Sequence, residues 1–169
     1  DGSAYWMSEN GFFRYAGKLE SLPCLVEDFV YDNINLESGN QMVSAGLNNL
    51  FGEVMWFYPT TGSSVVNRMV CYNYFDSSPQ RPVWTVGSLA RTMWQDSAVF
   101  GSPHATEYTA GNDSSFDVVG NTEGRTIYYQ HETGTDQVQG GATTAITANI
   151  SSGDFDISQR TTALGQTTG

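Results

Sequence analysis

Positively charged residues are scarce in this sequence. Lysine and arginine together number 7 against 18 aspartates and glutamates, so the formal charge at pH 7 is -11 and the isoelectric point lies near 4.2. A basic patch that grips phosphates is therefore missing, and we do not expect the chain to bind nucleic acid tightly by itself. The same charge has a second interpretation, because an acidic wall repels DNA and lets a polyanion slide past without sticking.

Helix-forming stretches are also rare. Charged residues make up only 15% of the chain, below the roughly 25% of ordinary soluble domains, and Ala-, Leu- or Glu-rich stretches with a 3.6-residue apolar period are hard to find. Aromatic, Gly, Ser, Thr and Asn residues are plentiful instead, which favours short strands and many turns. The length of 169 residues suits one hydrophobic core rather than two. We expect little helix, with the best candidate at residues 27–33.

Cysteines and long apolar runs are nearly absent. Cys24 and Cys71 are isolated, with no C-x-x-C spacing, so we expect buried reduced thiols rather than a disulfide. No stretch approaches the roughly 18 to 20 apolar residues of a membrane span, and we expect no signal peptide at residue 1, where the charged-then-apolar pattern of one is not seen. The sequence starts at Asp1 within a strand-like run and ends in a polar tail, so we expect a segment of a longer polypeptide.

Short aromatic runs between turn residues make up most of what is present. The Asn10-Gly11 step joins two of them and is a strong hairpin signal, and residues 17–23 are expected to return as a third strand. Three later runs predict an antiparallel meander. The runs that predict strands lie at residues 4–8, 12–15, 53–58, 67–74, 83–86, 126–132 and 145–150, with turn-like stretches at 59–64, 76–80 and 134–141.

A degenerate repeat organises these runs. An aromatic strand, a turn and a second aromatic strand occur at Trp6, at Trp56 and more weakly at Tyr128. Strands this short cannot bury both faces alone, which favours stacked sheets. We predict an all-β fold with β-propeller-like blades of short antiparallel strands, and a β-sandwich as the alternative. The propeller-type segment is expected over residues 1–157, followed by a polar tail over 158–169.

Residues suited to catalysis are few. His104 follows Ser102 closely and His131 follows an aromatic run, so the members of a Ser-His-Asp triad are available, but no G-x-S-x-G elbow holds a nucleophile. Acidic pairs are interpreted as solvated turn carboxylates, because glycosidase pairs are recognised by their separation in space rather than in sequence. These pairs are Glu27 with Asp28, Asp113 with Asp117, and Asp154 with Asp156.

A loop, an arginine and a group of aromatic clusters could each bind a ligand, but each also has a purely structural interpretation. The loop at 111–117 offers oxygen ligands for Ca²⁺ but lacks the terminal Glu of an EF-hand, so a bare turn is preferred. Arg91 follows a strand without the Walker pattern, and a buried or interface arginine paired with a carboxylate fits better than a phosphate loop. The aromatic clusters near Trp56, Tyr72 and Trp84 could stack sugars or bases, but alternation places about half of their side chains in the core. We predict no catalytic, cofactor-binding or metal-binding residues.

A family resemblance runs along the chain in a consistent order. The segments FGEVMWFYP at 51–59, NRMVCYNY at 67–74 and VWTVGSLART at 83–92 are similar to the elements FGEVWWFY, YVVYNY and VWxxGTLxRT of a phage structural-protein family. Three shorter segments match its LPC, VFxDIN and IESGDFDI elements: LPC at 22–24, VYDNIN at 30–35 and ISSGDFDI at 150–157. The chain thus resembles the packaged-DNA stabilisation or tail nozzle proteins of tailed-phage virions.

This resemblance implies a structural role and no enzymatic activity. The family is built around a β-propeller, usually forms a ring of six copies below the portal and adaptor, and has no catalytic residue in its motifs. We therefore expect a tail nozzle or hub at the head-to-tail connection, lining part of the DNA exit channel of a virion assembled in the host bacterial cytoplasm. The chain departs from the family at 95–109, at the apparent insertion 111–124 and after 157, which leaves the ring interface open.

Two other hypotheses stay open. One is a host-glycan-binding β module of a phage tail or capsid surface, which needs exposed aromatic platforms beside polar groups. The other is a glycan-cleaving tail enzyme, which needs two carboxylates about 5 to 10 Å apart in a groove. In that enzyme, replacing Glu53 or Asp154 would abolish turnover without unfolding the chain.

Overall fold

The computed structural model describes residues 2–35, 37, 42–109, 125–131, 135–137 and 143–145. The chain divides into two compact units, Asp1–Glu132 and Thr133–Gly169. The first unit contains β1 (Ala4–Ser8), β2 (Gly11–Tyr15), β3 (Leu19–Leu22), α1 (Glu27–Tyr31), β4 (Ser44–Asn48), β5 (Glu53–Tyr58), β6 (Arg68–Asn73), β7 (Trp84–Gly87), β8 (Met93–Gln95), α3 (Ser97–Phe100), β9 (His104–Thr109) and β10 (Arg125–Gln130). The second contains β11 (Thr135–Gln137) and β12 (Thr143–Ala145). None of the helices in these described ranges is long and apolar enough to cross a membrane.

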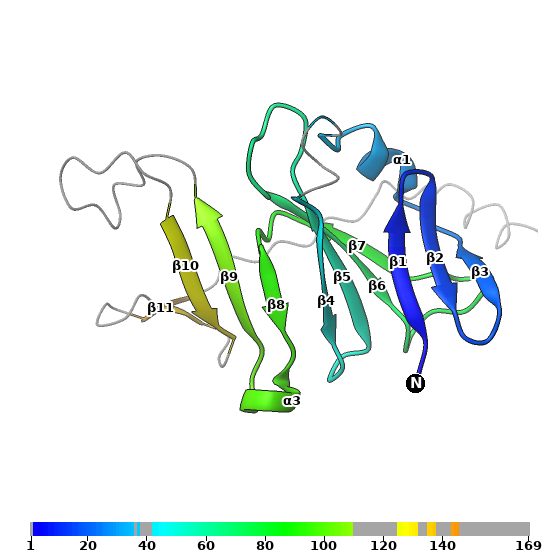
Figure 1. The fold of residues 1–169 in the computed structure, drawn as a ribbon. Helices are drawn as coiled ribbons and strands as arrows, with labels where there is room; N and C mark the ends of the chain where they lie inside the picture. The colour runs from blue at the N-terminus through cyan, green and yellow to red at the C-terminus, as the bar shows by residue number, and fades with distance from the viewer. Residues whose placement is uncertain are drawn as a thin grey trace, which may run out of the picture. The chain divides into compact units, whose positions relative to one another are not determined.

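Three antiparallel sheets follow one another along the first unit (Figure 1). Sheet 1 has the strand order β1-β2-β3, sheet 2 the order β4-β5-β6-β7 and sheet 3 the order β10-β9-β8, while β11 pairs with β12 in the second unit. Every strand pairs with its neighbour in sequence, as short connections dictate. The all-β prediction is confirmed, and within the described residues the sheets form an open series rather than a closed propeller.

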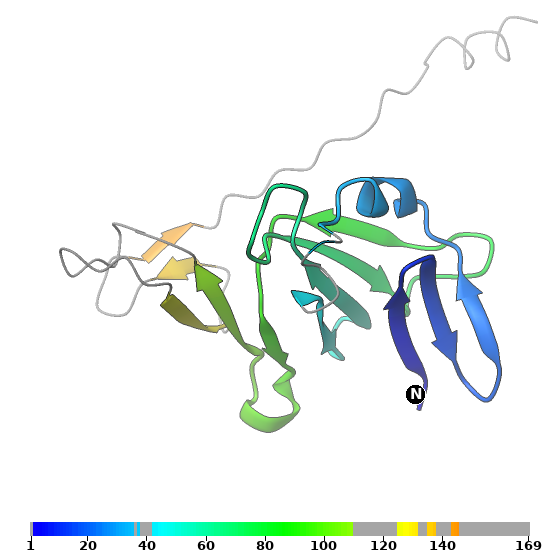
Figure 2. The same ribbon diagram turned by 45° about the horizontal axis from the view of Figure 1, so that its top comes forward.

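Sheet 2 lies between sheets 1 and 3, and both views show this order (Figures 1 and 2). Because sheet 2 has a neighbour on each side, every residue of β5 from Val54 to Tyr58 is buried. Side chains of a strand alternate between its faces. Val54, Trp56 and Tyr58 therefore belong to the core shared with sheet 1, whereas Met55 and Phe57 belong to a second core.

The core between sheets 1 and 2 is built from aromatic rings. The Phe12 ring of sheet 1 lies with its centroid 5.0 Å from that of Trp56 and 4.8 Å from that of Trp84. Trp84 also donates a hydrogen bond from Nε1 to the carbonyl of Pro23, at 2.8 Å. Phe12 and Trp56 are almost completely buried, so these rings bury apolar area that holds the two sheets together.

A tryptophan of sheet 3 packs against the second core. Trp94 of β8 packs against the buried cluster of Met55, Phe57, Val66 and Cys71, and its Nε1 donates a hydrogen bond to the carbonyl of Leu47 at 2.8 Å. The Trp94 side chain therefore holds β8 beside β4, the edge strand of sheet 2.

A short helix closes the end of sheet 1. Val30 of α1 is fully buried in the first core. The Tyr31 hydroxyl donates a hydrogen bond to the Ser8 carbonyl at 2.6 Å and accepts one from the Gly11 backbone N–H at 3.1 Å. The Asn-Gly turn of the first hairpin, where Gly11 has a φ of 133°, is thus fixed to α1.

Several sequence predictions need correction in detail. The predicted helix 27–33 ends at Tyr31, and β4, β8, β9 and α3 were not predicted. The stretch 134–141 was expected to be a turn, but it contains β11, because Thr135–Gln137 finds a partner in Thr143–Ala145. That partner strand ends where the predicted strand 145–150 begins, and residues 146–150 and the tail at 158–169 lie outside the described residues. Cys71 is buried, Cys24 is only half-buried, and neither forms a disulfide.

Candidate functional site

The aromatic clusters proposed from the sequence are packing groups. Trp56, Phe57 and Tyr58 are all buried, where strand alternation alone predicted about half. The prediction was too low because sheets cover both faces of β5. Tyr72 and Trp84 are half-buried and pack against the first core.

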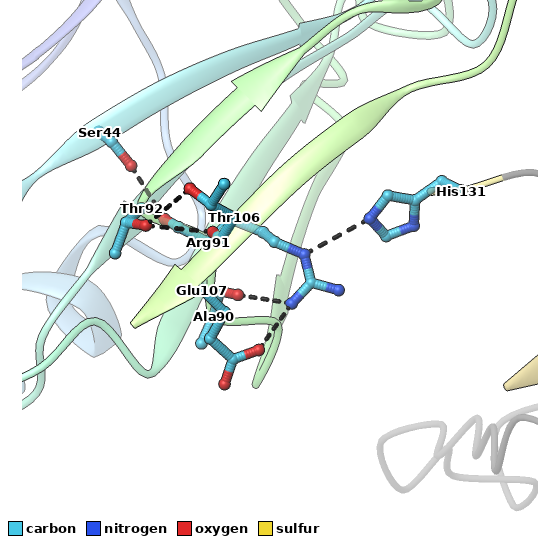
Figure 3. Close-up of polar contacts among 7 residues, drawn as sticks. All are labelled: Ser44, Ala90, Arg91, Thr92, Thr106, Glu107 and His131. Atoms are coloured by element: carbon cyan, nitrogen blue, oxygen red, sulfur yellow. Dashed lines mark hydrogen bonds and ion pairs between the residues drawn. The ribbon is translucent and has the colours of Figure 1, made fainter. Parts of the chain in front are cut away.

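The most connected polar group surrounds Arg91, which lies between β7 and β8 and is only 5% exposed. Its Nη1 lies 3.0 Å from Glu107 Oε2 and donates a second hydrogen bond to the Ala90 carbonyl at 2.6 Å, while Nε donates to His131 Nε2 at 3.4 Å (Figure 3). The guanidinium carbon also lies 3.8 Å from the centroid of the Tyr129 ring. The prediction of a buried arginine paired with a carboxylate is confirmed.

The backbone around Arg91 links two sheets. The Ser44 hydroxyl of β4 donates a hydrogen bond to the Arg91 carbonyl at 3.0 Å, and the next residue, Thr92, donates its backbone N–H to the Thr106 carbonyl of β9 at 2.7 Å (Figure 3). Arg91 thus occupies the point where the chain leaves sheet 2 and enters sheet 3. Its contacts fix the geometry of that crossing.

Burial controls the electrostatics of this group. Burial lowers the pKa of the Arg91 guanidinium, and the nearby Tyr129 and Glu107 oppose that effect. The pKa of His131 is lowered by burial first and then by the charge of Arg91 and by His104. A neutral imidazole follows, with Nε2 free to accept the hydrogen bond from Arg91. The positive charge of Arg91 is thus paired within the fold, by Glu107 and the Tyr129 ring. This arrangement suits a structural role.

Among the residues that the structure describes, neither histidine is part of a catalytic triad. His104 Nε2 lies 3.4 Å from the Ser102 hydroxyl, but its Nδ1 contacts the Tyr128 hydroxyl. No carboxylate contacts His104 in the part of the chain that the structure describes, so the group that orients a catalytic imidazole is missing there. His131 is separately engaged with Arg91.

The acidic candidates are dispersed. Glu27 and Asp28 occupy the first turn of α1. Negative charges at this position interact favourably with the helix dipole. Glu53 accepts a hydrogen bond from Asn48 Nδ2 at 3.0 Å. Among the described residues no three His, Cys, Asp or Glu side chains gather as a metal site. The loop 111–117 and the pairs Asp113 with Asp117 and Asp154 with Asp156 lie outside the described residues.

Sequence reasoning missed two of the groups that hold the sheets in place. Trp94 lies in no motif, and the motif element at 30–35 that contains Tyr31 did not indicate its contact, although a buried Trp N–H or Tyr O–H usually finds a hydrogen-bond partner. No protein-family model matches the sequence, and a search of curated proteins finds no match.

Proposed function

We propose that this chain is a structural component of a tailed-phage virion, part of a tail nozzle or hub at the head-to-tail connection. The observation that carries the proposal is the stacking of successive antiparallel sheets, in which strand β5 of sheet 2 is buried on both faces. Sheets stacked in this way are the construction principle of β-propeller blades. The structure itself is an open series of sheets, so the propeller remains part of the proposal.

The placement of the resemblance motifs supports this function. The segment 51–59 supplies β5, 67–74 supplies β6, and 83–92 supplies β7 together with Arg91. Their aromatic and apolar side chains contribute to both cores, and Arg91 links sheet 2 to sheet 3. In these segments the motif residues serve packing, as a rigid wall requires.

Charge supports a wall that does not hold DNA. Of the few cationic side chains, Arg91 pairs with Glu107 at 3.0 Å and Arg14 with Glu20 at 3.6 Å. With a formal charge of -11, the surface repels a polyanion within about 8 Å at physiological salt. Genomic DNA then passes along the channel without tight binding. Copies of the chain, usually six in the family it resembles, and the portal and adaptor proteins are the proposed partners.

Cryo-electron microscopy of the intact virion tests this proposal. We expect the chain in a ring on the tail axis, with its carboxylates facing the channel. A position on the outside of the tail or capsid, away from the axis, would contradict it.

A host-glycan-binding module is the second candidate, favoured by exposed aromatics. Trp6 and Phe13 stack with ring centroids 5.8 Å apart, and Trp6 and the neighbouring Tyr15 are exposed. Such rings can stack on sugars. Retention of the chain on host polysaccharide, lost on replacing Trp6 by Ala, would favour this candidate over the nozzle.

A further inference from the structure

The turn of the first hairpin contains the only Asn-Gly step of the sequence. The Asn10 side chain is exposed and makes no hydrogen bond to a described residue. A short amide side chain reaches the neighbouring backbone nitrogen, and glycine has no side chain to hinder that approach. Asn10 is therefore placed for deamidation, in which the Gly11 nitrogen attacks the amide carbon of Asn10.

The nitrogen that must attack is engaged by α1. Gly11 is buried, and its N–H donates a hydrogen bond to the Tyr31 hydroxyl at 3.1 Å. The same hydroxyl donates to the carbonyl of Ser8 at 2.6 Å, and Ser8 is the residue that pairs with Gly11 across the hairpin. A buried N–H that loses its partner costs free energy. The Tyr31 hydroxyl therefore occupies the position from which a base must remove the amide proton of Gly11.

A carboxylate beside the turn acts in the same direction. Glu27 Oε1 lies 3.5 Å from the position that a Cβ atom on Gly11 would take. Deprotonation makes the Gly11 nitrogen an anion, and a negative charge this close raises the cost of that step. Burial raises the pKa of Tyr31 to about 12, and the charge of Glu27 adds to the rise. The hydroxyl thus stays protonated near neutral pH and is no base for the reaction.

We propose that Asn10 is a site of covalent modification by deamidation, which the Tyr31 hydroxyl holds in check. Hydroxide removes the Gly11 amide proton and becomes water, and the nitrogen bonds to Asn10 Cγ while the bond from Cγ to the side-chain nitrogen breaks. That nitrogen takes a proton from water and leaves as ammonia, which closes a succinimide ring. Water then opens the ring at either carbonyl and gives aspartate or isoaspartate. Water enters, ammonia leaves, and nothing is oxidised or reduced.

Either product alters the first hairpin. Each adds a negative charge near Glu27 to a chain whose formal charge is already -11. Isoaspartate also routes the main chain through the former side chain, so the turn between Ser8 and Gly11 becomes longer. The Gly11 N–H is then displaced from the Tyr31 hydroxyl, and the hairpin loses its attachment to α1. This modification goes beyond the proposed function and is independent of it.

Mass spectrometry of the tryptic peptide that ends at Arg14 measures the reaction, because Asn10 has the only side-chain amide in residues 1–14. The 169-residue chain is kept at pH 8, either folded or unfolded in guanidinium chloride, and sampled over time. Conversion of Asn10 should be slower in the folded chain by about tenfold or more, because the hydrogen bond and the fixed backbone both oppose the attack.

Two variants separate the hydroxyl from the stability of the fold. Tyr31→Phe keeps the ring and should speed conversion in the folded chain about 2- to 10-fold, the value of one hydrogen bond. Gly46→Ala is the matched control, because its added Cβ meets Trp94 between sheets 2 and 3 and destabilises the fold away from the hairpin. The rate in Gly46→Ala should equal that of the unaltered chain. Circular dichroism of each variant confirms that the fold is retained.

Three results would overturn the proposal. The first is equal conversion of Asn10 in the folded and the unfolded chain. The second is a Tyr31→Phe protein that converts no faster than the unaltered chain. The third is a Gly46→Ala protein that is accelerated as much as Tyr31→Phe, since conversion would then proceed through global unfolding rather than through loss of the hydroxyl.

Discussion

The side chain of Trp94 occupies the space where a Cβ atom of residue 46 would lie. A Cβ built on Gly46 meets Trp94 Cγ at 2.6 Å, and Gly46 belongs to the edge strand of sheet 2. The absence of a side chain at this position therefore allows sheets 2 and 3 to approach each other. Gly46 lies in none of the sequence motifs, yet it sets the spacing of these two sheets.

Replacing Gly46 with Ala should lower the free energy of unfolding by about 1 to 3 kcal/mol, the usual cost of overpacking. Urea unfolding followed by tryptophan fluorescence measures the change. Gly87→Ala is the control, since its added Cβ makes only ordinary van der Waals contacts, with Met69 Cε at 3.4 Å, Met69 Cγ at 3.5 Å and the Leu89 backbone nitrogen at 4.0 Å. If steric contact is the cause, the Gly46→Ala cost shrinks in a Trp94→Leu background, and an equal cost in both backgrounds would refute it.

Replacing Glu107 with Gln should destabilise the fold by about 3 kcal/mol, because it leaves the Arg91 charge buried without its partner. The side chain of Glu107 is 23% exposed, which places the effect at the low end of the range for buried pairs. Chemical denaturation measures it. Arg91→Met in the same background should recover part of the loss, since it removes the unpaired charge, and a double variant less stable than Glu107→Gln alone would speak against this account.

Stability should fall as the pH is lowered through the ordinary titration range of histidine, near 6.5. His131 has a lowered pKa in the fold, so the unfolded chain takes up a proton at a pH where the folded chain does not. The contribution is complete above the unfolded pKa and is lost as the pH drops toward the folded one. Unfolding free energies at pH 7.5 and 5.5 measure this, and the loss should be smaller in His131→Asn. An equal loss in both proteins would exclude His131 as the cause.

Much of the first hairpin and the meander could be predicted because their signals are local. The Asn10-Gly11 step specifies a turn, and the aromatic run at 53–58 has the same bounds as β5. Strand β4 is different, since SAGLN contains no β-branched or aromatic residue. It forms a strand because it pairs with β5 and because Gly46, which has no side chain, leaves room for the Trp94 ring.

The sequence predicted that Arg91 pairs with a carboxylate, but it did not identify which carboxylate. A lone arginine in an acidic chain, following a strand, indicates a carboxylate partner, but Glu107 lies 16 residues away on another sheet. Periodicity describes one strand at a time, so it could not reveal that β5 is covered on both faces. That coverage depends on contacts far apart in the sequence.

Replacing Tyr31 with Phe should cost about 1 to 3 kcal/mol, because the Gly11 N–H and the Ser8 carbonyl lose a shared partner in a half-buried site. Thermal unfolding measures the change. The control is Tyr15→Phe, which removes a hydroxyl from an exposed ring and should have little effect. A Tyr31→Phe protein as stable as the control would show that water replaces the hydroxyl at no cost.

The two thiols should differ in reactivity in the folded chain. Burial, reinforced by the charge of Glu53, raises the pKa of Cys71 to about 12, and burial, reinforced by Glu27, raises that of Cys24 to about 11. The thiolate is the reactive form, so at pH 8 both should react with Ellman's reagent far more slowly than in the unfolded chain. Cys71 should be the slower, since it is buried and Cys24 only half-buried. Single-cysteine variants Cys24→Ser and Cys71→Ser assign the two rates. If Cys71 reacts in the native protein as fast as it does in urea, then its strand opens far more readily than its place between two sheets allows.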